Sequence, residues 1–341
     1  MKKSIAVDGG GYVPGRPVQS GIERIIDGFL SSVDKRDIKL YTFNRSSYPY
    51  VHTVPQRGYS SFFLPLDVIK NRDTVFLGFS GVIPKLLTHT NCKKIGFLYD
   101  FGFIKYPQFY PSHQKLASQT QETIKRSDII VVLSEAAKEE LAAFFPMNKG
   151  KRVEVVQAGI DHVSLPPSDI KNDYFLTVGV IKPVKNTFGV IELFEQYCSR
   201  YEDNKTELRI MGRHEPAYFQ QIQQSSVYKK MNKRIIFVES ARDDEIYTAM
   251  ASARAFINLS HEEGYCFPVL EAAALGAIVI VNDLPVHREH RSAFPQIEIG
   301  KTADEMMEVM HKSRVKKKRG LITIPDEYTW KSFTKRVLSL I

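Results

Sequence analysis

The chain has 341 residues, of which 43% are hydrophobic and 25% are charged. This length suits two globular domains of roughly 150 residues each, and the composition excludes a disordered chain. The three cysteines, Cys92, Cys198 and Cys266, stand far apart without CxxC spacing, which argues against a disulfide framework or a zinc site and favours a reducing compartment. The N-terminus does not resemble a secretory signal, and no stretch approaches the ~20 apolar residues of a membrane span. We expect a cytoplasmic protein, either soluble or peripheral on the inner face of a membrane.

The net charge of +9 is concentrated in the first half, where residues 1–165 carry 22 Lys and Arg against 15 Asp and Glu. Such a balance suits an anionic membrane surface, a phosphorylated acceptor or nucleic acid, and a merely solvated surface explains it equally well. The densest basic run, KSRVKKKR at 312–319, is either a solvated connector or a contact with a membrane or polyanion. It contains no aromatic residue, and no other stretch interleaves aromatics with Lys and Arg, so nucleic-acid binding is not expected.

Strands and helices alternate along the first half of the chain. The apolar strand KSIAVDGGG is followed by SGIERIIDGFLSSV, where Ile22, Ile25, Ile26, Phe29 and Leu30 fall at helical spacing. Further strands are expected at IKLYTF, DTVFLGF, KKIGFLYD, DIIVVLS and VEVVQAG, with helices at HQKLASQTQETIKRS and EAAKEELAAFF.

Proline and charge interrupt the alternation at SLPPSDIKND, which we expect to be a linker at 164–173. The pattern then restarts, with strands at YFLTVGV, ELRIMG, RIIFVE, AFINLS and AIVIVND and helices at 187–201, PAYFQQIQQSS, DDEIYTAMASA and from Pro268. Alternation of this kind predicts α/β architecture with two successive parallel sheets.

Ligands of doubly wound sheets lie at the carboxyl ends of the strands, so residues that directly follow strands are candidates for chemistry. The glycines of DGGGYVPG allow backbone to approach a ligand, or form a simple turn. Asp100 either caps the next turn or faces a cleft. Lys182 and Lys185 are candidates to neutralise a diphosphate, and Arg213 to contact a phosphate or base, although loop cations are usually just solvated.

The stretch HEEGYCFPVLEAAALG at 261–276 combines two glutamates with a loop and an apolar helix. Gly264 lets the loop pass close to a ligand, and Pro268 suits the first turn of the helix, in which Glu271 is also expected. The helix N-terminus favours phosphate, and carboxylates accept hydrogen bonds from hydroxyls. These chemistries together suggest a nucleotide sugar. Complementing the helix dipole would explain Glu271 without a ligand, but leaves Glu263 unexplained.

The segment AMASARAFINLSHEEGYCFPVLEAAALGAIVIVND resembles the donor-binding region of family 4 retaining glycosyltransferases, and the E-x7-E spacing of Glu263 and Glu271 matches. YFLTVGVIKPVKN and DLPVHREH are similar to further landmarks of that family. In the first half, SGIERIIDGFL, LYDFGFIKYPQFYP, SDIIVVLSEAAKEEL and VEVVQAGID follow in the family's order. The resemblance therefore covers nearly the whole chain.

The resemblance implies the GT-B fold, with two Rossmann-like domains facing across a cleft. It implies an N-terminal acceptor-side domain at 1–165, a C-terminal nucleotide-sugar domain at 166–325, and a C-terminal helix at 326–341 that packs back on the first domain. The family assigns Glu263 to the sugar hydroxyls, Glu271 to the ribose and Lys185 to the diphosphate. The residues carried over are catalytic Glu263, Lys185 and Asp100, and donor-binding Glu271, Gly264, Tyr265, Cys266, Phe267, Gly10, Gly11, Lys182, Arg213 and Glu289.

The expected reaction follows from the same resemblance. A lysine and helix N–H groups stabilise the charge that develops on the leaving diphosphate. No Asp-x-Asp metal pair is present and the family works without one, so no metal or cofactor is expected beyond the nucleoside-diphosphate sugar itself. Retention is usually explained in the family by a front-face mechanism, in which the leaving phosphate accepts the acceptor's proton. No protein nucleophile is therefore named.

The sequence departs from the family pattern in three places. Tyr99 replaces a histidine that many members carry before Asp100. Val180 and Val184 stand where arginine is common, and Cys266 replaces the second glycine of the E-G-F-G loop. The donor pocket is therefore expected to be unusual, and a non-catalytic nucleotide-sugar-binding relative stays open as an alternative, as does a GT-B epimerase or hydrolase.

Donor base, sugar, acceptor and linkage are not readable from these residues. Acceptor contacts are expected in divergent loops such as NRSSYPYVHTVPQRGYSSFF at 44–63, whose five aromatic rings suit sugar stacking, a lipid-facing surface or a partly packed loop. The expected acceptor is a glycan or a lipid-linked glycan.

Overall fold

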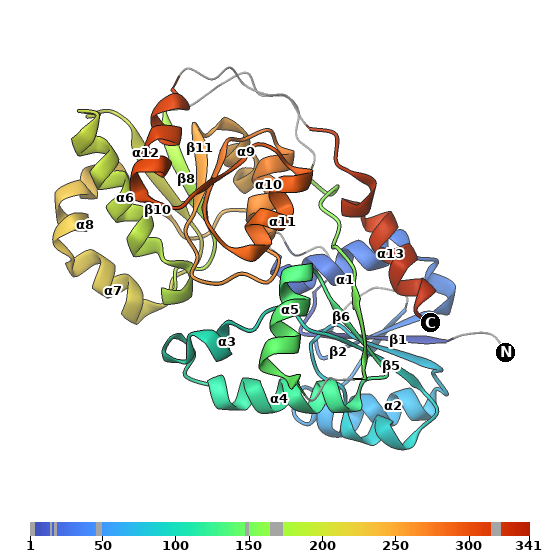
Figure 1. The fold of residues 1–341 in the computed structure, drawn as a ribbon. Helices are drawn as coiled ribbons and strands as arrows, with labels where there is room; N and C mark the ends of the chain where they lie inside the picture. The colour runs from blue at the N-terminus through green and yellow to red at the C-terminus, as the bar shows by residue number, and fades with distance from the viewer. Residues whose placement is uncertain are drawn as a thin grey trace. The chain divides into compact units, whose positions relative to one another are not determined.

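The computed structural model describes residues 4–13, 16, 19–45, 50–146, 150–163, 173–314 and 322–341. The chain divides into two compact units, one formed by Met1–His162 together with Asp326–Ile341 and the other by Val163–Pro325 (Figure 1). Most of the expected linker at 164–173, and residues 315–319 of the basic run, lie outside the described residues.

The first unit contains a seven-stranded sheet in the order β3-β2-β1-β4-β5-β6-β7, in which neighbouring strands run parallel. The order reverses between β1 and β4, and such a switch point is where doubly wound sheets place their ligands. The strands are β1 Ile5–Gly10, β2 Ile38–Thr42, β3 Val51–Thr53, β4 Val75–Gly78, β5 Lys93–Phe97, β6 Ile129–Val132 and β7 Arg152–Val155.

Helices connect these strands. A capping box starts the first of them, because Ser20 accepts from the Glu23 N–H while the Glu23 carboxylate accepts from the Ser20 N–H. The helices are α1 Gly21–Ser32, α2 Leu64–Lys70, α3 Gly102–Lys105, α4 His113–Arg126 and α5 Glu135–Phe144, with a π-helical turn, η2, at Tyr59–Phe63 and a 3-10 turn, η3, at Lys85–His89.

Helix α13, Trp330–Ser339, belongs to the first unit and packs on α1. The Trp330 ring lies so close to Gly28 and Gly159 that a Cβ at either glycine would overlap it. The Trp330 N–H donates to Asp161 Oδ1 at 2.8 Å, and the indole Nε1 donates to His162 Nδ1 at 3.1 Å. The last helix is thus fixed by both ring packing and directed hydrogen bonds.

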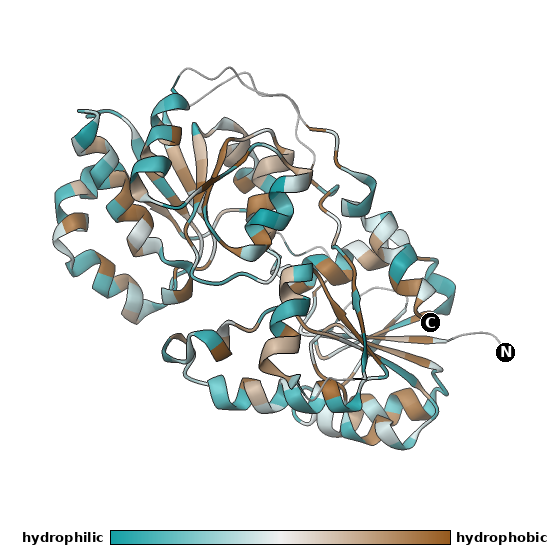
Figure 2. Cartoon of the chain, in the orientation of Figure 1, coloured by the Kyte–Doolittle hydropathy of each residue, from teal (hydrophilic) through white to brown (hydrophobic). Residues whose placement is uncertain are grey.

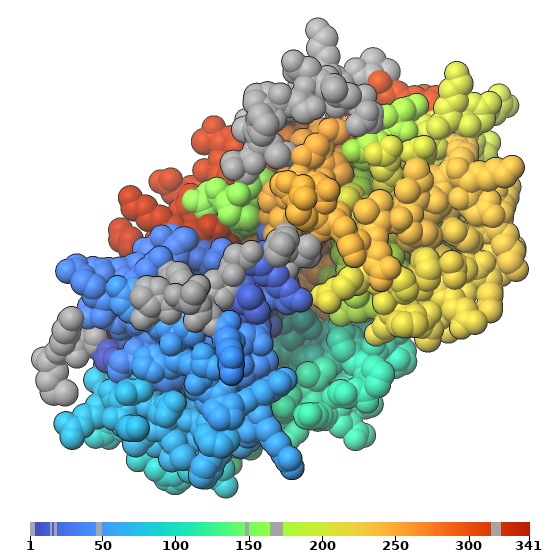
Figure 3. Space-filling model, turned by 180° about the vertical axis from the view of Figure 1, so that it is seen from behind, coloured from blue at the N-terminus to red at the C-terminus, as the bar shows by residue number. Residues whose placement is uncertain are grey.

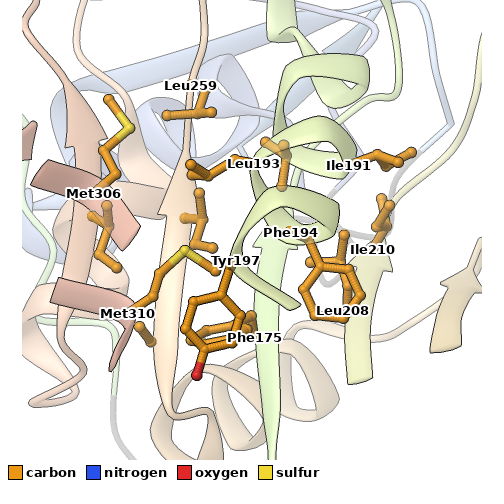
Figure 4. Packing of buried hydrophobic residues seen from close by; sticks show 14 of the residues in the cluster. Phe175, Ile191, Leu193, Phe194, Tyr197, Leu208, Ile210, Leu259, Met306 and Met310 are labelled. Carbon is orange, nitrogen blue, oxygen red and sulfur yellow. The ribbon is translucent and has the colours of Figure 1, made fainter. Parts of the chain in front are cut away.

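The second unit contains a six-stranded parallel sheet in the order β10-β9-β8-β11-β12-β13. Its strands are β8 Tyr174–Val178, β9 Glu207–Met211, β10 Ile235–Val238, β11 Ala255–Asn258, β12 Val279–Asn282 and β13 Ile297–Gly300. Its helices are α6 Thr187–Arg200, α7 Pro216–Gln224, α8 Ser226–Met231, α9 Asp243–Ser252, α10 Phe267–Ala274, α11 Pro285–Ala293 and α12 Ala303–Lys312. Figure 4 shows Phe194 and Tyr197 of α6 and Met310 of α12 packed together with Phe175.

The predicted fold class is confirmed, because both units are α/β structures with parallel sheets. Figure 2 shows the expected hydropathy pattern, with brown strands and helices whose outward sides are largely teal. The strands β3 and β13 and the helices α2, α3, α8, α11 and α12 were not predicted. Strand β3 spans only three residues, which is too short for an alternating pattern to stand out.

Candidate functional site

An ion pair joins two loops of the second unit. Lys185 ends the short 3-10 turn η6, Pro183–Lys185, after β8, and Glu263 lies in the loop after β11. The Lys185 Nζ lies 2.6 Å from Glu263 Oε1, and Ser260 Oγ donates to the same oxygen at 2.7 Å. The side chain of Glu263 is 8% exposed and that of Lys185 is 29% exposed. The carboxylate is therefore largely enclosed, while the ammonium stays accessible to a ligand.

The pair fixes the charge of the carboxylate. Burial alone would raise the pKa of Glu263, but the charge of Lys185 and the hydrogen bonds from Lys185 and Ser260 outweigh it and hold the pKa below its ordinary value. Glu263 is therefore ionised near neutral pH and acts only as a hydrogen-bond acceptor. Such a group suits ligand hydroxyls.

Three polar residues that sequence reasoning missed support this pair. Asn282 Nδ2 donates to the carbonyl of Ser260 at 2.9 Å, and the Asn282 carbonyl lies 2.9 Å from His287 Nδ1. A carbonyl only accepts, so His287 carries its proton on Nδ1 and presents Nε2 as an acceptor. His287 is fully buried, and burial lowers its pKa. Ser260 and Asn282 come at or just after strand ends, which is the signal that could have identified them.

Two buried acceptors of this cluster lack a partner. Within the part of the chain that the structure describes, neither His287 Nε2 nor Asn282 Oδ1 receives a hydrogen bond. A buried acceptor without a donor costs ~1–3 kcal/mol, so such atoms usually receive a hydrogen bond from water or a ligand. The cluster therefore favours an occupant that can donate hydrogen bonds.

Cys266 initiates helix α10 in an unusual conformation. Its φ of 60° lies in the left-handed region, which favours glycine, and this explains why glycine suits the position in the family pattern. The thiol is buried, with Asn258 Nδ2 3.6 Å from Sγ, and burial raises its pKa well above the ordinary value. The substitution of glycine by cysteine thus keeps the backbone path and adds an enclosed sulfur.

The prediction that Glu271 lies in the first turn of the helix is wrong. The left-handed Cys266 starts the helix at Phe267, one residue earlier than expected, so Glu271 is its fifth residue. It is 1% exposed. The effect of the helix dipole falls off beyond the first turn, so charge complementarity does not account for this buried carboxyl group.

The remaining donor-side candidates lie around the same loops. Val184 is buried, and its carbonyl accepts from the His261 N–H at 2.8 Å, which joins the loops after β8 and β11. The Arg213 carbonyl accepts from the Ile181 N–H at 2.8 Å, while Arg213 as a whole is exposed. The other candidates of the second unit are half-buried Lys182 and Glu289, exposed Val180, and buried Gly264, Tyr265 and Phe267.

Tyr265 and Phe267 flank the cysteine with aromatic rings. Their centroids lie 5.1 Å apart, and His290 lies 5.1 Å from Tyr265 on an edge-on approach. His290 Nε2 lies 2.5 Å from the Tyr265 carbonyl. Helix α11 thereby holds the loop that carries Glu263.

The candidates Gly10, Gly11 and Asp100 belong to the first unit. Gly10 has a φ of 52°, and its N–H donates to Asp8 Oδ1 at 3.1 Å. Asp100 is exposed and its Oδ1 accepts from the Gly102 N–H at 3.3 Å, as in a capped turn, and its expected place at a cleft stays a prediction. Tyr99, which replaces the family's histidine, donates to the Phe79 carbonyl at 2.6 Å.

Behind Gly10 lies a buried acid that sequence reasoning missed. Asp8 is fully buried, receives a 2.8 Å hydrogen bond from the Tyr59 hydroxyl, and accepts another from Ser80. Burial nevertheless raises the pKa of Asp8 to about 6. Because Asp8 also accepts from the Gly10 N–H, its carboxylate holds the glycine turn at the end of β1 in place.

Two kinds of feature are absent from the described residues. They contain no cluster of three or more His, Cys, Asp or Glu side chains arranged to hold a metal ion. None of their helices is both long and apolar enough to cross a membrane.

The fold is that of GT-B glycosyltransferases. The structure of WaaG, a glycosyltransferase involved in lipopolysaccharide biosynthesis, superposes with a TM-score of 0.69 at 16% identity, covering 99% of this chain and 95% of that one. Sucrose-phosphate synthase from Thermosynechococcus elongatus gives 0.68 at 13% identity, covering 99% and 94%.

Parts of the chain are similar in sequence to known glycosyltransferases. Residues 166–292 match the family model "Glycosyl transferases group 1". O-antigen chain mannosyltransferase RfbU of Salmonella typhimurium is 24% identical over 192 residues, 56% of this chain and 52% of that protein. Serotype-specific mannosyltransferase WbdA of Escherichia coli is 28% identical over 116 residues, 34% of this chain and 14% of that protein. The chain thus spans only about half the length of RfbU and less of WbdA, and the structural comparisons show the GT-B fold.

Proposed function

We propose that the protein is a metal-independent, retaining glycosyltransferase of the family 4 type. It moves a hexose-type sugar from a nucleoside-diphosphate sugar to a glycan or lipid-linked glycan, in surface polysaccharide or glycoconjugate synthesis. The observation that carries the proposal is the Lys185–Glu263 ion pair at the strand ends of the second unit, inside the segment that matches the group 1 family. The E-x7-E spacing of Glu263 and Glu271 supports the family 4 assignment.

Each group of the pair has a separate task in this proposal. Ionised Glu263 accepts hydrogen bonds from hydroxyls of the transferred sugar, while partly exposed Lys185 neutralises the charge that grows on the leaving diphosphate. Buried Glu271 holds the ribose hydroxyls. The leaving phosphate takes the proton of the attacking acceptor hydroxyl, so the enzyme supplies position and charge rather than a nucleophile.

Mannose is the first sugar to test as the transferred group, because both curated relatives are named as mannosyltransferases. The basic first half supports a cytoplasmic protein that is peripheral on the inner face of a membrane, where a lipid-linked acceptor is presented. No nucleic acid is involved in this proposal.

A thermal-shift panel tests the donor site. It contains GDP-mannose and other nucleotide sugars with UDP, GDP, dTDP and ADP, and uses the wild type, Glu271→Gln and the surface control Ser32→Ala. A ligand at 100 times its dissociation constant adds about 2.7 kcal/mol of stability. We expect one nucleotide family to raise Tm in the wild type and in Ser32→Ala, and to have a much weaker effect on Glu271→Gln.

The same experiment separates the alternatives. If no nucleotide shifts the wild type, the donor-site proposal is overturned. If a donor binds, its turnover without acceptor would instead identify a hydrolase or epimerase, and binding without any turnover across acceptors would identify a non-catalytic relative. Retention is checked by the anomeric configuration of the product in NMR spectra.

A further inference from the structure

Exposed apolar side chains gather on one short segment of the first unit. Among the described residues, seven large hydrophobic side chains are exposed, and four of them fall within eight consecutive residues. The exposed fraction is 56% for Phe62, 38% for Phe63, 41% for Leu66 and 42% for Ile69. Single exposed hydrophobic residues are ordinary, whereas a cluster of this kind marks an interaction surface.

The backbone places these side chains on one face. The π turn η2 runs directly into α2, and Phe62, Leu66 and Ile69 follow at spacings of four and three residues, which puts them along one side of the helix. The Phe63 ring meets Phe62 edge-on, with centroids 5.5 Å apart. The segment is therefore apolar on a face that does not point into the protein.

The opposite face already anchors the helix. Tyr59, Leu64 and Val68 are buried in the hydrophobic core of the first unit, at 8%, 0% and 1% exposure. The exposed face is thus not needed for folding. Among the aromatic residues expected in the loop at 44–63, Tyr59 packs inward, while Phe62 and Phe63 point outward.

Exposed cations flank the apolar segment in sequence and lie on an element packed against it. Lys70 and Arg72 are exposed at the end of α2, Arg57 is exposed before η2, and Lys85 is exposed on η3, which packs against η2 and α2. Between residues 50 and 72 the only acidic residue is Asp67, and it is half-buried. Segments that combine an apolar face with Lys and Arg bind the interface of anionic bilayers.

We propose that this docking surface, defined by Phe62, Phe63, Leu66, Ile69, Lys70 and Arg72, attaches the protein to an anionic lipid bilayer. The region around residues 50–75 lies on the light-blue lower part of the first unit in Figure 3. A nucleic acid would use the cations but leave the apolar side chains in water, and a neutral apolar partner would leave the cations without use. An anionic bilayer accommodates both the apolar side chains and the cations. The inference deepens the proposed function by naming the surface that would face a lipid-linked acceptor.

Vesicle flotation of the full chain tests the proposal without requiring activity. The vesicles contain either phosphatidylcholine alone or phosphatidylcholine rich in phosphatidylglycerol. The apolar variant is Phe62→Ser/Leu66→Ser/Ile69→Ser and the charge variant is Lys70→Gln/Arg72→Gln. The matched control, Ile22→Ser/Ile236→Ser, removes two other exposed hydrophobic side chains, each 37% exposed.

We expect the wild type and the control to float with the anionic vesicles, and the apolar variant to bind them at least about tenfold more weakly. The charge variant should lose most of the preference for anionic over neutral vesicles and most of its salt dependence. Wild type that stays unbound, or an apolar variant that binds as tightly as the wild type, overturns the proposal. A concentration-dependent dimer that the apolar variant abolishes, without vesicle binding, also overturns it and identifies a second copy as the occupant.

Two controls keep the outcomes separate. Far-UV circular dichroism and the thermal unfolding midpoint establish that each variant is folded. The nucleotide-sugar thermal shift should be unchanged in the apolar variant, because its substitutions lie outside the unit that carries Lys185 and Glu263. A missing nucleotide shift in every protein would count against the proposed function and leave the flotation result intact.

Discussion

Lys185 and Glu263 are separated by 78 residues in sequence, yet their side chains meet at 2.6 Å. One follows β8 and the other follows β11, which are neighbours in the sheet of the second unit. Because Glu263 holds the Lys185 ammonium in place, a diphosphate would meet a positioned cation. Preorganisation of this kind spares the reaction the cost of moving a charge at the moment of transfer.

Breaking the Lys185–Glu263 ion pair should lower the stability of the protein. Lys185→Met removes the cation that compensates a largely buried carboxylate and should lower the free energy of unfolding by ~1–3 kcal/mol. Glu263→Gln removes the charge and should cost less. Urea unfolding of both variants and of the double variant gives the coupling energy. A double variant whose cost equals the sum of the single costs would contradict a direct interaction.

The same variants should lose catalysis by more than they lose stability. If Lys185 neutralises the leaving diphosphate, Lys185→Met should lower kcat by roughly 10²–10³. Lys185→Arg keeps the charge with a different shape and should retain part of the rate. Steady-state rates measured well below each variant's Tm check this, and an Lys185→Met enzyme with the wild-type kcat would exclude the role.

The buried acid of the first unit should leave a pH signature. Burial raises the pKa of Asp8 from 3.8 to about 6, so between these values the folded protein holds a proton that the unfolded chain has lost. The free energy of unfolding should therefore fall as pH rises from about 4 to about 6 and show no further loss from this group above that range, a change of ~3 kcal/mol.

Asp8→Asn should flatten this pH dependence, because its amide does not titrate and can still bond with Tyr59 and Ser80. Urea unfolding midpoints across this pH range compare the two proteins. An unaltered slope in Asp8→Asn would show that another group is responsible.

The packing of the last helix predicts a sensitive glycine. A Cβ at Gly28 would lie 2.0 Å from the Trp330 ring, so Gly28→Ala must displace the ring and should lower stability by ~1–3 kcal/mol. Trp330 is the only tryptophan of the chain, so its fluorescence reports this site directly. A red shift of emission and a lower Tm are expected, while exposed Ser32→Ala in the same helix should change neither.

The three cysteines should be unreactive in the folded protein. Burial raises the pKa of Cys92 to about 12 and that of Cys198 to about 11, and it also raises the pKa of Cys266 well above its ordinary value. The thiolate is the reactive form, and access is blocked as well. Ellman's reagent should therefore report three thiols in denaturant and almost none natively, and a fast native thiol would contradict the burial of its residue.

The architecture was readable from sequence because it rests on local patterns. Ile25, Ile26 and Phe29 recur at helical spacing and all three are buried in α1. The α2 segment shows where this logic stops. SFFLPLDVIK is apolar on more than one side, so spacing alone cannot tell that Leu64 and Val68 enter the core while Phe62 and Leu66 remain exposed.

The site was only partly readable. The sequence motif pointed to Lys185 and Glu263, and the structure joins them, but their roles stay a proposal. His287 was missed because its environment depends on the Asn282 carbonyl, which only the folded chain brings to it. Glu271 was expected in the first turn of a helix that starts at Pro268, but the left-handed backbone of Cys266, which residue type alone does not predict, starts the helix at Phe267.

The chain leaves the first unit at His162 and returns to it at Asp326, so the second unit interrupts the first in the order of synthesis. On the ribosome, Gly28 and Gly159 are made long before Trp330, which covers both. More than 160 intervening residues must therefore be synthesised before the last helix can pack on the first unit. Domains generally fold as units in the order of their synthesis, and here the N-terminal unit is expected to finish last. A chain that terminates before residue 330 would contain the whole second unit, while Gly28 and Gly159 of its first unit would lack the tryptophan that covers them.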